Sequence, residues 1–254
     1  MPQPTTPGSG ADFDAPTTVE PKKPQKASLL DDFMDIFYAP SAVFARRANA
    51  DFWIPLIIVS LLLGLLFFAN RDLMEPVMDA EFARNAAKNP RMAQMTPEQL
   101  AAAKAIGEKI GRIAGWVFPP IVMLVLGVVI WIVGKFVDAK ESVNAAIVIA
   151  VFSYVPRVVE QVINRAQGLI IDPSTINSRY SLTLGLGRFF DPDTTSPILL
   201  GLIGRIDVFT IWVTVLIAIG LAVTGKISRG RAAIAAVVVW LVGALPTLAG
   251  SLGQ

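Results

Sequence analysis

The sequence predicts an all-α integral membrane protein with five transmembrane helices, an N-terminal interfacial helix, and an amphipathic outer helix before the second span. The first observation is composition, since 54% of the 254 residues are hydrophobic and 17% are charged. The second is a set of five apolar runs, each near the ~20 residues that cross ~30 Å of hydrocarbon. The third is the concentration of Lys and Arg in short connections on one side. The runs cover residues 52–69, 116–134, 143–163, 205–224 and 231–250.

The composition also excludes several classes of function. The chain contains no cysteine and no histidine. Disulfides, thiolate nucleophiles, Cys/His zinc sites, haem ligation by His and triads with an imidazole base are therefore excluded. Lys and Arg are spread among the loops without a long basic stripe, so we expect no nucleic-acid partner. We also expect no cofactor, no metal and no enzymatic activity, because no set of residues identifies a reaction.

The N-terminal region divides into a tail and a helical segment. Residues 1–27 are rich in Pro, Thr, Gly and charge, which predicts a disordered cytoplasmic tail. Residues 28–47 predict an interfacial amphipathic segment with Ser28 as N-cap and a break at Pro40. We expect its apolar and acidic residues on opposite sides of a helix, and the alternative is a cytoplasmic helix packed on the bundle. The apolar positions are Leu29, Leu30, Phe33, Ile36 and Phe37, and the acidic positions are Asp31, Asp32 and Asp35.

Residues 48–254 are expected to form the five-span membrane domain, and the distribution of Lys and Arg predicts its N-in, C-out orientation. The turns 135–142 and 225–230 then face the cytoplasm, whereas the longer segments 70–115 and 164–204 face outward. The positive residues that this orientation places inside are Lys22, Lys23, Lys26, Arg46, Arg47, Lys135, Lys140, Lys226, Arg229 and Arg231.

An amphipathic outer helix is predicted to lead into the second span. Thr96 is its expected N-cap and Gln99 the capping-box partner. The periodicity of its apolar residues predicts that the helix lies along or near the outer surface. We expect Pro119 and Pro120 to disturb the helix further along. The apolar face consists of Leu100, Ala103, Ile106, Ile110 and Ile113.

Four charged residues fall inside the third and fourth predicted spans. At 1.5 Å per residue, Arg157 and Glu160 lie roughly 21 and 25 Å from the start of the third span. On the antiparallel fourth span, Asp207 and Arg205 lie at roughly 25 and 28 Å. An unpaired charge at a helix centre costs about 2.5–3.5 kcal/mol, so we expect one cluster, with Tyr154 beside it. The cluster either joins the two spans, lines a polar cavity for a solute, ion or lipid headgroup, or marks helices that end early.

Three motifs lie at separate points of the chain. They are IFYAP at residues 36–40, SYVP at residues 153–156, and FTIWVTVLIAIGLA followed by a basic turn and an Ala-rich helix. Together they resemble the YIP family, which carries the Ypt/Rab-interacting-protein domain, and the resemblance covers roughly residues 30–250. The family's element corresponding to IFYAP is D-L-Y-G-P. Because Ile36 and Ala39 replace its Asp and Gly, binding of Rab-type GTPases is not carried over.

The resemblance implies a five-span, N-in, C-out bacterial membrane scaffold or trafficking-type protein. We expect a non-enzymatic scaffold or adaptor in the bacterial cytoplasmic (inner) membrane, with the lipid bilayer, other membrane proteins and a second copy as partners. The predicted contact surface lies just ahead of the first span and includes Phe33, Phe37, Tyr38 and Pro40. The alternative function is a transporter or channel component for a small solute, ion or lipid that uses the charge cluster.

Overall fold

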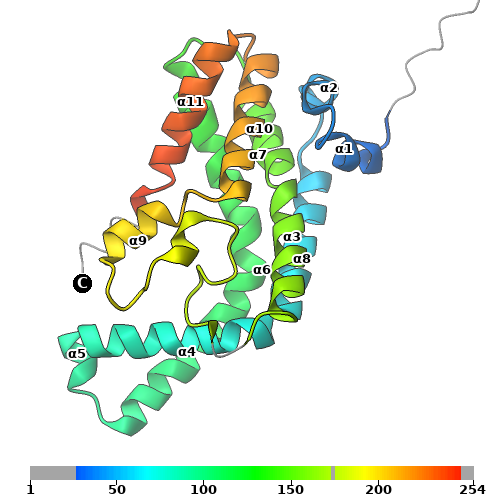
Figure 1. Cartoon of the computed structure of the whole chain (residues 1–254). Coiled ribbons are helices and arrows are strands. Elements are labelled where there is room, and N and C mark those ends of the chain that lie inside the picture. The colour runs from blue at the N-terminus through cyan, green and yellow to red at the C-terminus, as the bar shows by residue number, and fades with distance from the viewer. Residues whose placement is uncertain (1–26, 173–174, 247–254) are drawn as a thin grey trace, which may run out of the picture.

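The chain folds into helices that are joined by short turns and by one long loop. The computed structural model describes residues 27–172 and 175–246 (Figure 1). Within these ranges there is no strand, and the one isolated bridge joins Gly185 and Asp207. This confirms the all-α class. The predicted tail, apart from Ala27, and the end of the fifth run after residue 246 lie outside the described residues.

Two short helices precede a bundle of longer helices, and the long loop carries two further short ones. The helix bounds are α1 (Leu29–Asp35), α2 (Pro40–Arg47), α3 (Trp53–Ala69), α4 (Arg71–Lys88), α5 (Pro90–Ala93), α6 (Pro97–Lys135), α7 (Val143–Ser153), α8 (Val155–Gly168), η2 (Leu186–Phe189), α9 (Pro197–Ile203), α10 (Val208–Thr224) and α11 (Arg229–Val242). In Figure 1, α4 and α5 lie across one end of the bundle, whereas α1 and α2 lie toward the other end.

Two helices in the described chain are long and apolar enough to cross a membrane. They are α6, with 39 residues, and the α7–α8 pair, which extends over 26 residues from Val143 to Gly168. A third would be α3 with α4 if that pair, bent by 73°, formed one span. The apolar α10 has 17 residues and α11 has 14, so they are only about 25 and 21 Å long. The predicted number of five spans and their orientation therefore stay predictions.

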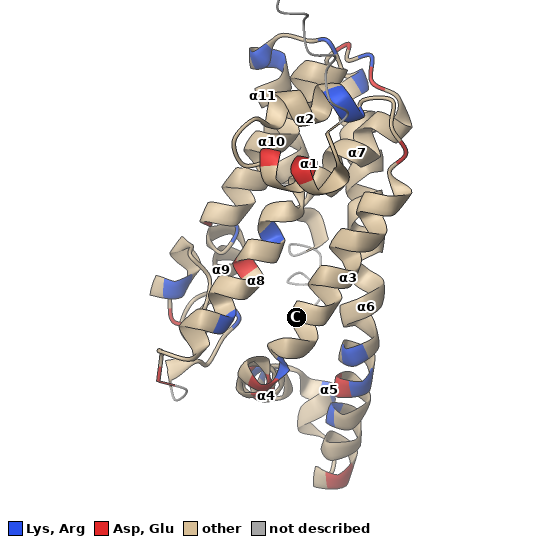
Figure 2. Ribbon diagram, turned by 90° about the vertical axis from the view of Figure 1, so that its right-hand side faces the viewer, with Lys and Arg blue, Asp and Glu red and all other residues tan. Residues whose placement is uncertain are grey.

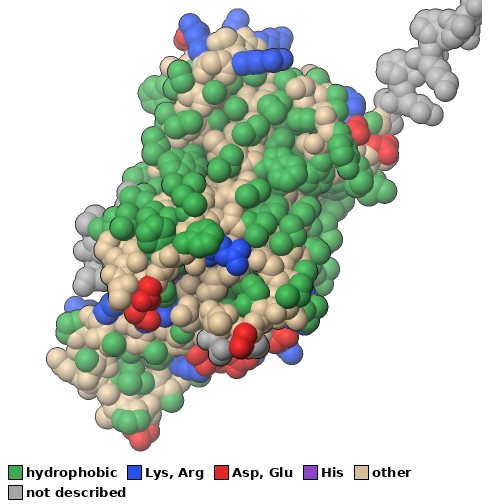
Figure 3. Space-filling view, viewed as in Figure 1, with side chains coloured by type: hydrophobic (Ala, Val, Ile, Leu, Met, Phe, Trp, Pro, Cys, Tyr) green, Lys and Arg blue, Asp and Glu red, His purple; other side chains and the backbone are tan. Residues whose placement is uncertain are grey.

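The centre of the bundle is α7, whose residues from Ala145 to Ser153 are all buried. It packs against α3, α6 and α10, and small residues bring these helices close together. Large hydrophobic side chains also remain exposed along α3, α6, α10 and α11. Figure 3 shows such side chains covering much of the visible face between two ends that carry charge. This distribution is that of a bundle whose outer surface faces lipid.

Lys and Arg residues gather at the end of the bundle where α2 and the turns α6–α7 and α10–α11 lie (Figure 2). The opposite end, at α4 and the beginning of α6, carries both signs of charge. The two signs are interspersed there, for example where Lys104 forms an ion pair with Asp79 at 2.8 Å. The bundle therefore has one predominantly basic end, as the sequence pattern predicts.

The structure corrects two expectations about individual helices. Pro119 and Pro120 lie inside α6 and do not end it, although each removes one backbone donor. Membrane helices tolerate such residues because neighbouring groups satisfy the freed carbonyls. On α1, the three acidic residues expected on one side do not share one environment, because Asp32 is 0% exposed and bound to two arginines of α2. The predicted N-caps Ser28 and Thr96 are both confirmed as capping boxes.

Candidate functional site

The predicted intramembrane charges lie just after the break between α7 and α8 and at the beginning of α10. Tyr154 occupies the break between α7 and α8, and Pro156 stands in the first turn of α8. Because proline lacks a backbone N–H, it suits the first turn of a helix, where that donor has no helical partner. The break begins a new helix whose inner side carries Arg157 and Glu160.

Arg157 is the centre of a group of four polar side chains that we call the Arg157 cluster: Arg157, Glu160, Asp207 and Thr210. Its Nη1 donates to Glu160 Oε2 at 2.6 Å and lies 3.8 Å from Asp207 Oδ1. Its Nη2 donates to Thr210 Oγ1 at 2.6 Å. Both carboxylates are buried, and the guanidinium side chain is 25% exposed. One cation therefore joins a carboxylate of α8 to the beginning of α10.

Asp207 has its place in the Arg157 cluster because it is the N-cap of α10. Its carboxylate accepts the backbone N–H groups of Phe209 at 2.9 Å and Thr210 at 3.0 Å, and it also accepts the Thr210 hydroxyl. The positive end of the helix dipole favours a negative charge at this position. The cap thus fixes the Asp207 carboxylate at the beginning of α10, where Arg157 Nη1 lies 3.8 Å from Oδ1.

Arg205 lies outside the ion pairs of the described chain. Its Nη1 and Nη2 donate to the carbonyls of Gly243 at 2.8 Å and Trp240 at 2.6 Å, and its guanidinium stacks over the Trp240 ring at 5.3 Å. It therefore caps the C-terminal end of α11, where carbonyls lack helical partners and the dipole is negative. The expected four-charge cluster is in fact three charges with Thr210, because α11 ends earlier than the sequence predicts.

A polar contact that the sequence analysis missed joins the corner between α3 and α4 to α8. Asn70 is buried, and its amide donates to the carbonyl of Gln161 at 3.0 Å and to its side-chain oxygen at 3.2 Å. A lone Asn at the end of an apolar run was the available signal. Together with the Arg157 cluster, this contact ties α8 to the helices on both of its sides.

The Arg157 cluster is a set of ion pairs and hydrogen bonds that connects α8 to α10. The arginine contacts both acids and the hydroxyl, and Asp207 accepts further hydrogen bonds from the backbone and side chain of α10. An unpaired charge at this depth would cost about 2.5–3.5 kcal/mol, which mutual pairing offsets. Arg157, Glu160, Asp207 and Tyr154 lie in this region, whereas Arg205 binds the carbonyls at the C-terminal end of α11.

The residues of the predicted contact surface lie on and after α1, but they face different directions. Phe33 packs on Phe152 with ring centroids 5.6 Å apart, and Phe37 meets Trp212 edge-on at 5.3 Å. Tyr38 is 79% exposed. Pro40 begins α2. The aromatic segment therefore provides two anchors on the bundle and one outward-facing ring.

A bundle of apolar helices whose internal charges pair with one another defines a helical membrane protein. The sequence model of the Yip1 domain matches residues 34–250, which is most of the chain. The chain therefore belongs to the Yip1 domain family, and this confirms the resemblance that the IFYAP and SYVP motifs indicated. No curated protein and no solved structure matches the chain.

Proposed function

We propose that this protein is a non-enzymatic, multi-pass membrane scaffold or adaptor, and that α1 is the element that binds its partner. In this proposal the chain crosses the bacterial inner membrane five times, with α1 on the cytoplasmic side. The observation that carries the proposal is an exposed apolar stripe on a helix that is itself held firmly in place. The pairing within the Arg157 cluster supports a structural role for that cluster and favours a scaffold over a transporter.

The position of α1 is held by a buried carboxylate. Asp32 Oδ1 accepts from Arg46 Nη2 at 2.6 Å, and its Oδ2 accepts from Arg47 Nε at 2.5 Å. Charge-assisted bonds of this kind are stronger than neutral ones, and the exposed fraction of Asp32 is zero. With Phe33 and Phe37 anchored on the bundle, the helix presents one fixed face outward. Such preorganisation lowers the entropy cost of binding a partner.

Leu30 and Met34 lie one turn apart on α1, and Tyr38 follows in the turn between α1 and α2. Their exposed fractions are 71%, 56% and 79%. The i, i+4 spacing of Leu30 and Met34 is typical of a helix that binds the apolar face of another helix. With Tyr38 beside them, three large apolar side chains are exposed within nine residues, which is more than the scattered exposure expected of a soluble surface.

Acidic residues beside the stripe indicate the chemistry of the partner. Asp31 is exposed, and the Ser28 hydroxyl that donates to its carboxylate lowers the pKa of Asp31, so it is ionised at neutral pH. Asp35 shares Arg46 with Asp32 and remains partly exposed. Anionic lipid would be repelled by these acids. We therefore propose that the partner is another membrane protein with an apolar helix flanked by Lys or Arg.

The test compares two variants by cross-linking in native membranes with peptide-level mapping. Leu30→Ala with Tyr38→Ala should lower the yield of heterologous cross-links at α1 at least fivefold, because the stripe loses most of its apolar area. Phe136→Ala is the matched control, since this 83% exposed side chain follows α6 at the same end of the bundle. Its cross-links should equal those of the wild type.

The sequence of the cross-linked partner peptide supports or contradicts the proposed adaptor function. A peptide with an apolar helix and flanking Lys or Arg supports an adaptor. If the double variant and the Phe136→Ala control gave equal cross-link yields, α1 would not be the partner-binding surface. If the only cross-links joined α1 to a second copy of the chain, the protein would self-associate and would not act as an adaptor. Thermal unfolding of each purified variant checks that α1 remains docked.

A further inference from the structure

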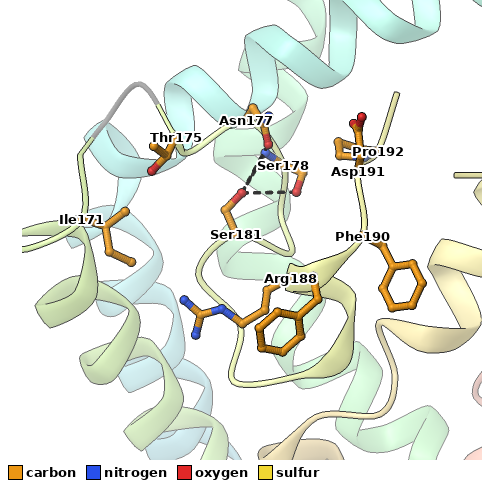
Figure 4. A pocket seen from close by; sticks show the side chains of 10 residues that line it. Ile171, Thr175, Asn177, Ser178, Ser181, Arg188, Phe190, Asp191 and Pro192 are labelled. Atoms are coloured by element: carbon orange, nitrogen blue, oxygen red, sulfur yellow. Dashed lines mark hydrogen bonds between the residues drawn. The ribbon is translucent and has the colours of Figure 1, made fainter. Parts of the chain in front are cut away.

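The long loop between α8 and α9 encloses a pocket of about 390 Å³ (Figure 4). This volume lies within the range of small-molecule sites. Its lining combines Arg188, Asp191, two serine hydroxyls and two aromatic rings. Figure 4 shows Asn177, Ser178 and Ser181 turned toward one another, with Arg188 and Asp191 on different sides of this group. The pocket is separate from the Arg157 cluster and from α1.

Two arginines fix the wall of the pocket to α4. Arg84 donates to the carbonyl of Asn177 at 2.6 Å. Arg179 binds both carboxylate oxygens of Glu81, at 2.8 and 2.5 Å. A small apolar core under the loop, formed by Val77, Ile176 and Leu182, adds to this attachment. The wall of the pocket that carries Asn177, Ser178 and Ser181 is therefore held in place before any ligand binds.

Arg188 provides an unused positive charge. It is exposed, and within residues 27–172 and 175–246 no hydrogen bond or ion pair joins its side chain to another residue. Ser178 and Ser181 share a hydrogen bond at 3.3 Å, and a hydroxyl can rotate to donate elsewhere. A guanidinium beside hydroxyl groups is suited to a phosphate, which it can bind through two parallel hydrogen bonds.

Asp191 gives the pocket a negative charge as well. One of its carboxylate oxygens accepts the backbone N–H of Asp193 at 2.9 Å, which leaves the other oxygen for a ligand. Phe190 contributes an aromatic face, which also attracts cations. A ligand with only negative charge would be repelled by Asp191. The pocket therefore suits a ligand that carries a phosphate and an ammonium group together.

The depth and surroundings of the loop point to a lipid as the source of that ligand. From Val143 to Gly168 the helix rises about 38 Å, which is close to the headgroup level of the far leaflet if it starts at the near boundary. Leu169, Ile170 and Phe189 follow and are 75%, 85% and 78% exposed. Such a collection of exposed apolar side chains in a loop is expected where acyl chains cover them.

We propose that this pocket binds the headgroup of a zwitterionic phospholipid. Arg188 and the Ser178–Ser181 hydroxyls bind the phosphate, Asp191 and Phe190 bind the ammonium group, and the acyl chains lie over the exposed residues of the loop. The proposal depends on insertion of the bundle in a bilayer and does not depend on partner binding by α1.

The experiment measures lipid binding to the full chain by native mass spectrometry after delipidation. Phosphatidylethanolamine and phosphatidylglycerol are added in turn, and the bound fractions are compared. Wild type should prefer phosphatidylethanolamine at least fivefold. Arg188→Gln should reduce its binding about tenfold, and Asp191→Asn should abolish the preference over phosphatidylglycerol. Arg91→Gln is the matched control, because Arg91 lies exposed on α5 and does not line the pocket.

Three outcomes would overturn the proposal. Equal binding of both lipids by wild type would show that the site does not select a zwitterionic headgroup. Unchanged binding in Arg188→Gln would show that the lipid does not bind in this pocket. If soluble phosphoethanolamine displaced the lipid at comparable concentration, the ligand would be a free metabolite and not a membrane lipid. Thermal unfolding of each variant separates loss of binding from loss of fold, and the α1 variants should bind lipid as the wild type does.

Discussion

Glu141 is a buried acid in the turn between α6 and α7 whose neighbours do not compensate its charge. The residue is 3% exposed, and neither carboxylate oxygen has a hydrogen-bond partner in the described chain. A β-carbon added at Gly225 would lie 2.9 Å from Oε2, and one at Gly134 would contact Oε1. These glycines mark the C-terminal ends of α10 and α6, where the helix dipoles disfavour a negative charge.

This arrangement predicts a stability change that depends on pH. Burial raises the pKa of Glu141 above its ordinary value of 4.5, and the nearby charge of Lys135 only partly opposes this. Because the folded protein prefers the protonated acid, the folded state loses stability as pH rises from 4.5 through the raised pKa. Glu141→Gln removes that loss and should stabilise the protein by about 1 kcal/mol at pH 7.5.

Thermal unfolding in detergent between pH 4 and pH 8 measures this effect. The midpoint difference between Glu141→Gln and wild type should shrink toward zero at the acidic end. Glu75→Gln is a suitable control, since this residue lies exposed on α4, away from Glu141. A difference that is constant across the range, or a variant less stable than wild type at pH 7.5, would contradict a Glu141 whose pKa is raised by burial.

Residue identity alone revealed the intramembrane charges but not all of their partners. The calculated depths of Arg157, Glu160 and Asp207 agreed, because the rise per residue is constant and depth therefore follows from sequence position. Arg205 fits the same level and yet binds the end of α11. Its partners are backbone carbonyls, which any sequence offers, so the choice depended on where α11 ends. That end is decided by tertiary packing.

At the scale of helices, caps and periodicity were predictable, whereas the behaviour of prolines was not. Ser28 and Thr96 act through side chains that bind the adjacent backbone, so a few residues contain the whole signal. Pro119 and Pro120 were expected to disturb α6, but the helix continues to Lys135. Whether a proline interrupts a helix depends on how its neighbours satisfy the freed carbonyls, and those neighbours come from other parts of the chain.

Two glycines of α6 give opposite predictions for the same substitution. A β-carbon at Gly127 would lie 2.7 Å from the Cα of Ile147 on α7, so Gly127→Ala must push the helices apart. Overpacking of this kind costs about 1–3 kcal/mol. At Gly107 nothing lies within 4 Å, and alanine there should stabilise the helix by about 0.5–1 kcal/mol.

Thermal or denaturant unfolding of the two variants in the same detergent gives the comparison. Gly127→Ala should unfold earlier than wild type, and Gly107→Ala should unfold at the same point or later. If both substitutions had the same sign, the close contact between α6 and α7 would not be present in the folded protein.

At the scale of the whole molecule, the length of the helices bears on how many of them span the membrane, and the distribution of charge bears on which ends face the cytoplasm. Only α6 and the α7–α8 pair have full membrane length, with α3 and α4 as a bent third candidate. The shorter α10 and α11 form a hairpin whose turn belongs to the basic end, and the loop before α10 lies toward the other end. Five spans follow if that hairpin crosses the bilayer, which the Lys and Arg distribution favours.

The topology prediction uses single cysteines, because the chain has none of its own. Lys140→Cys and Arg229→Cys lie in and after the two basic turns and should react with an impermeant thiol reagent only after the membrane is opened. Thr194→Cys, at an exposed position in the loop before α10, should react in intact cells. This pattern requires α10 to cross the bilayer despite its length of about 25 Å, which local thinning of the bilayer accommodates at modest cost. Reaction of Arg229→Cys from outside would mean that the hairpin does not cross, and the number of spans would fall to three.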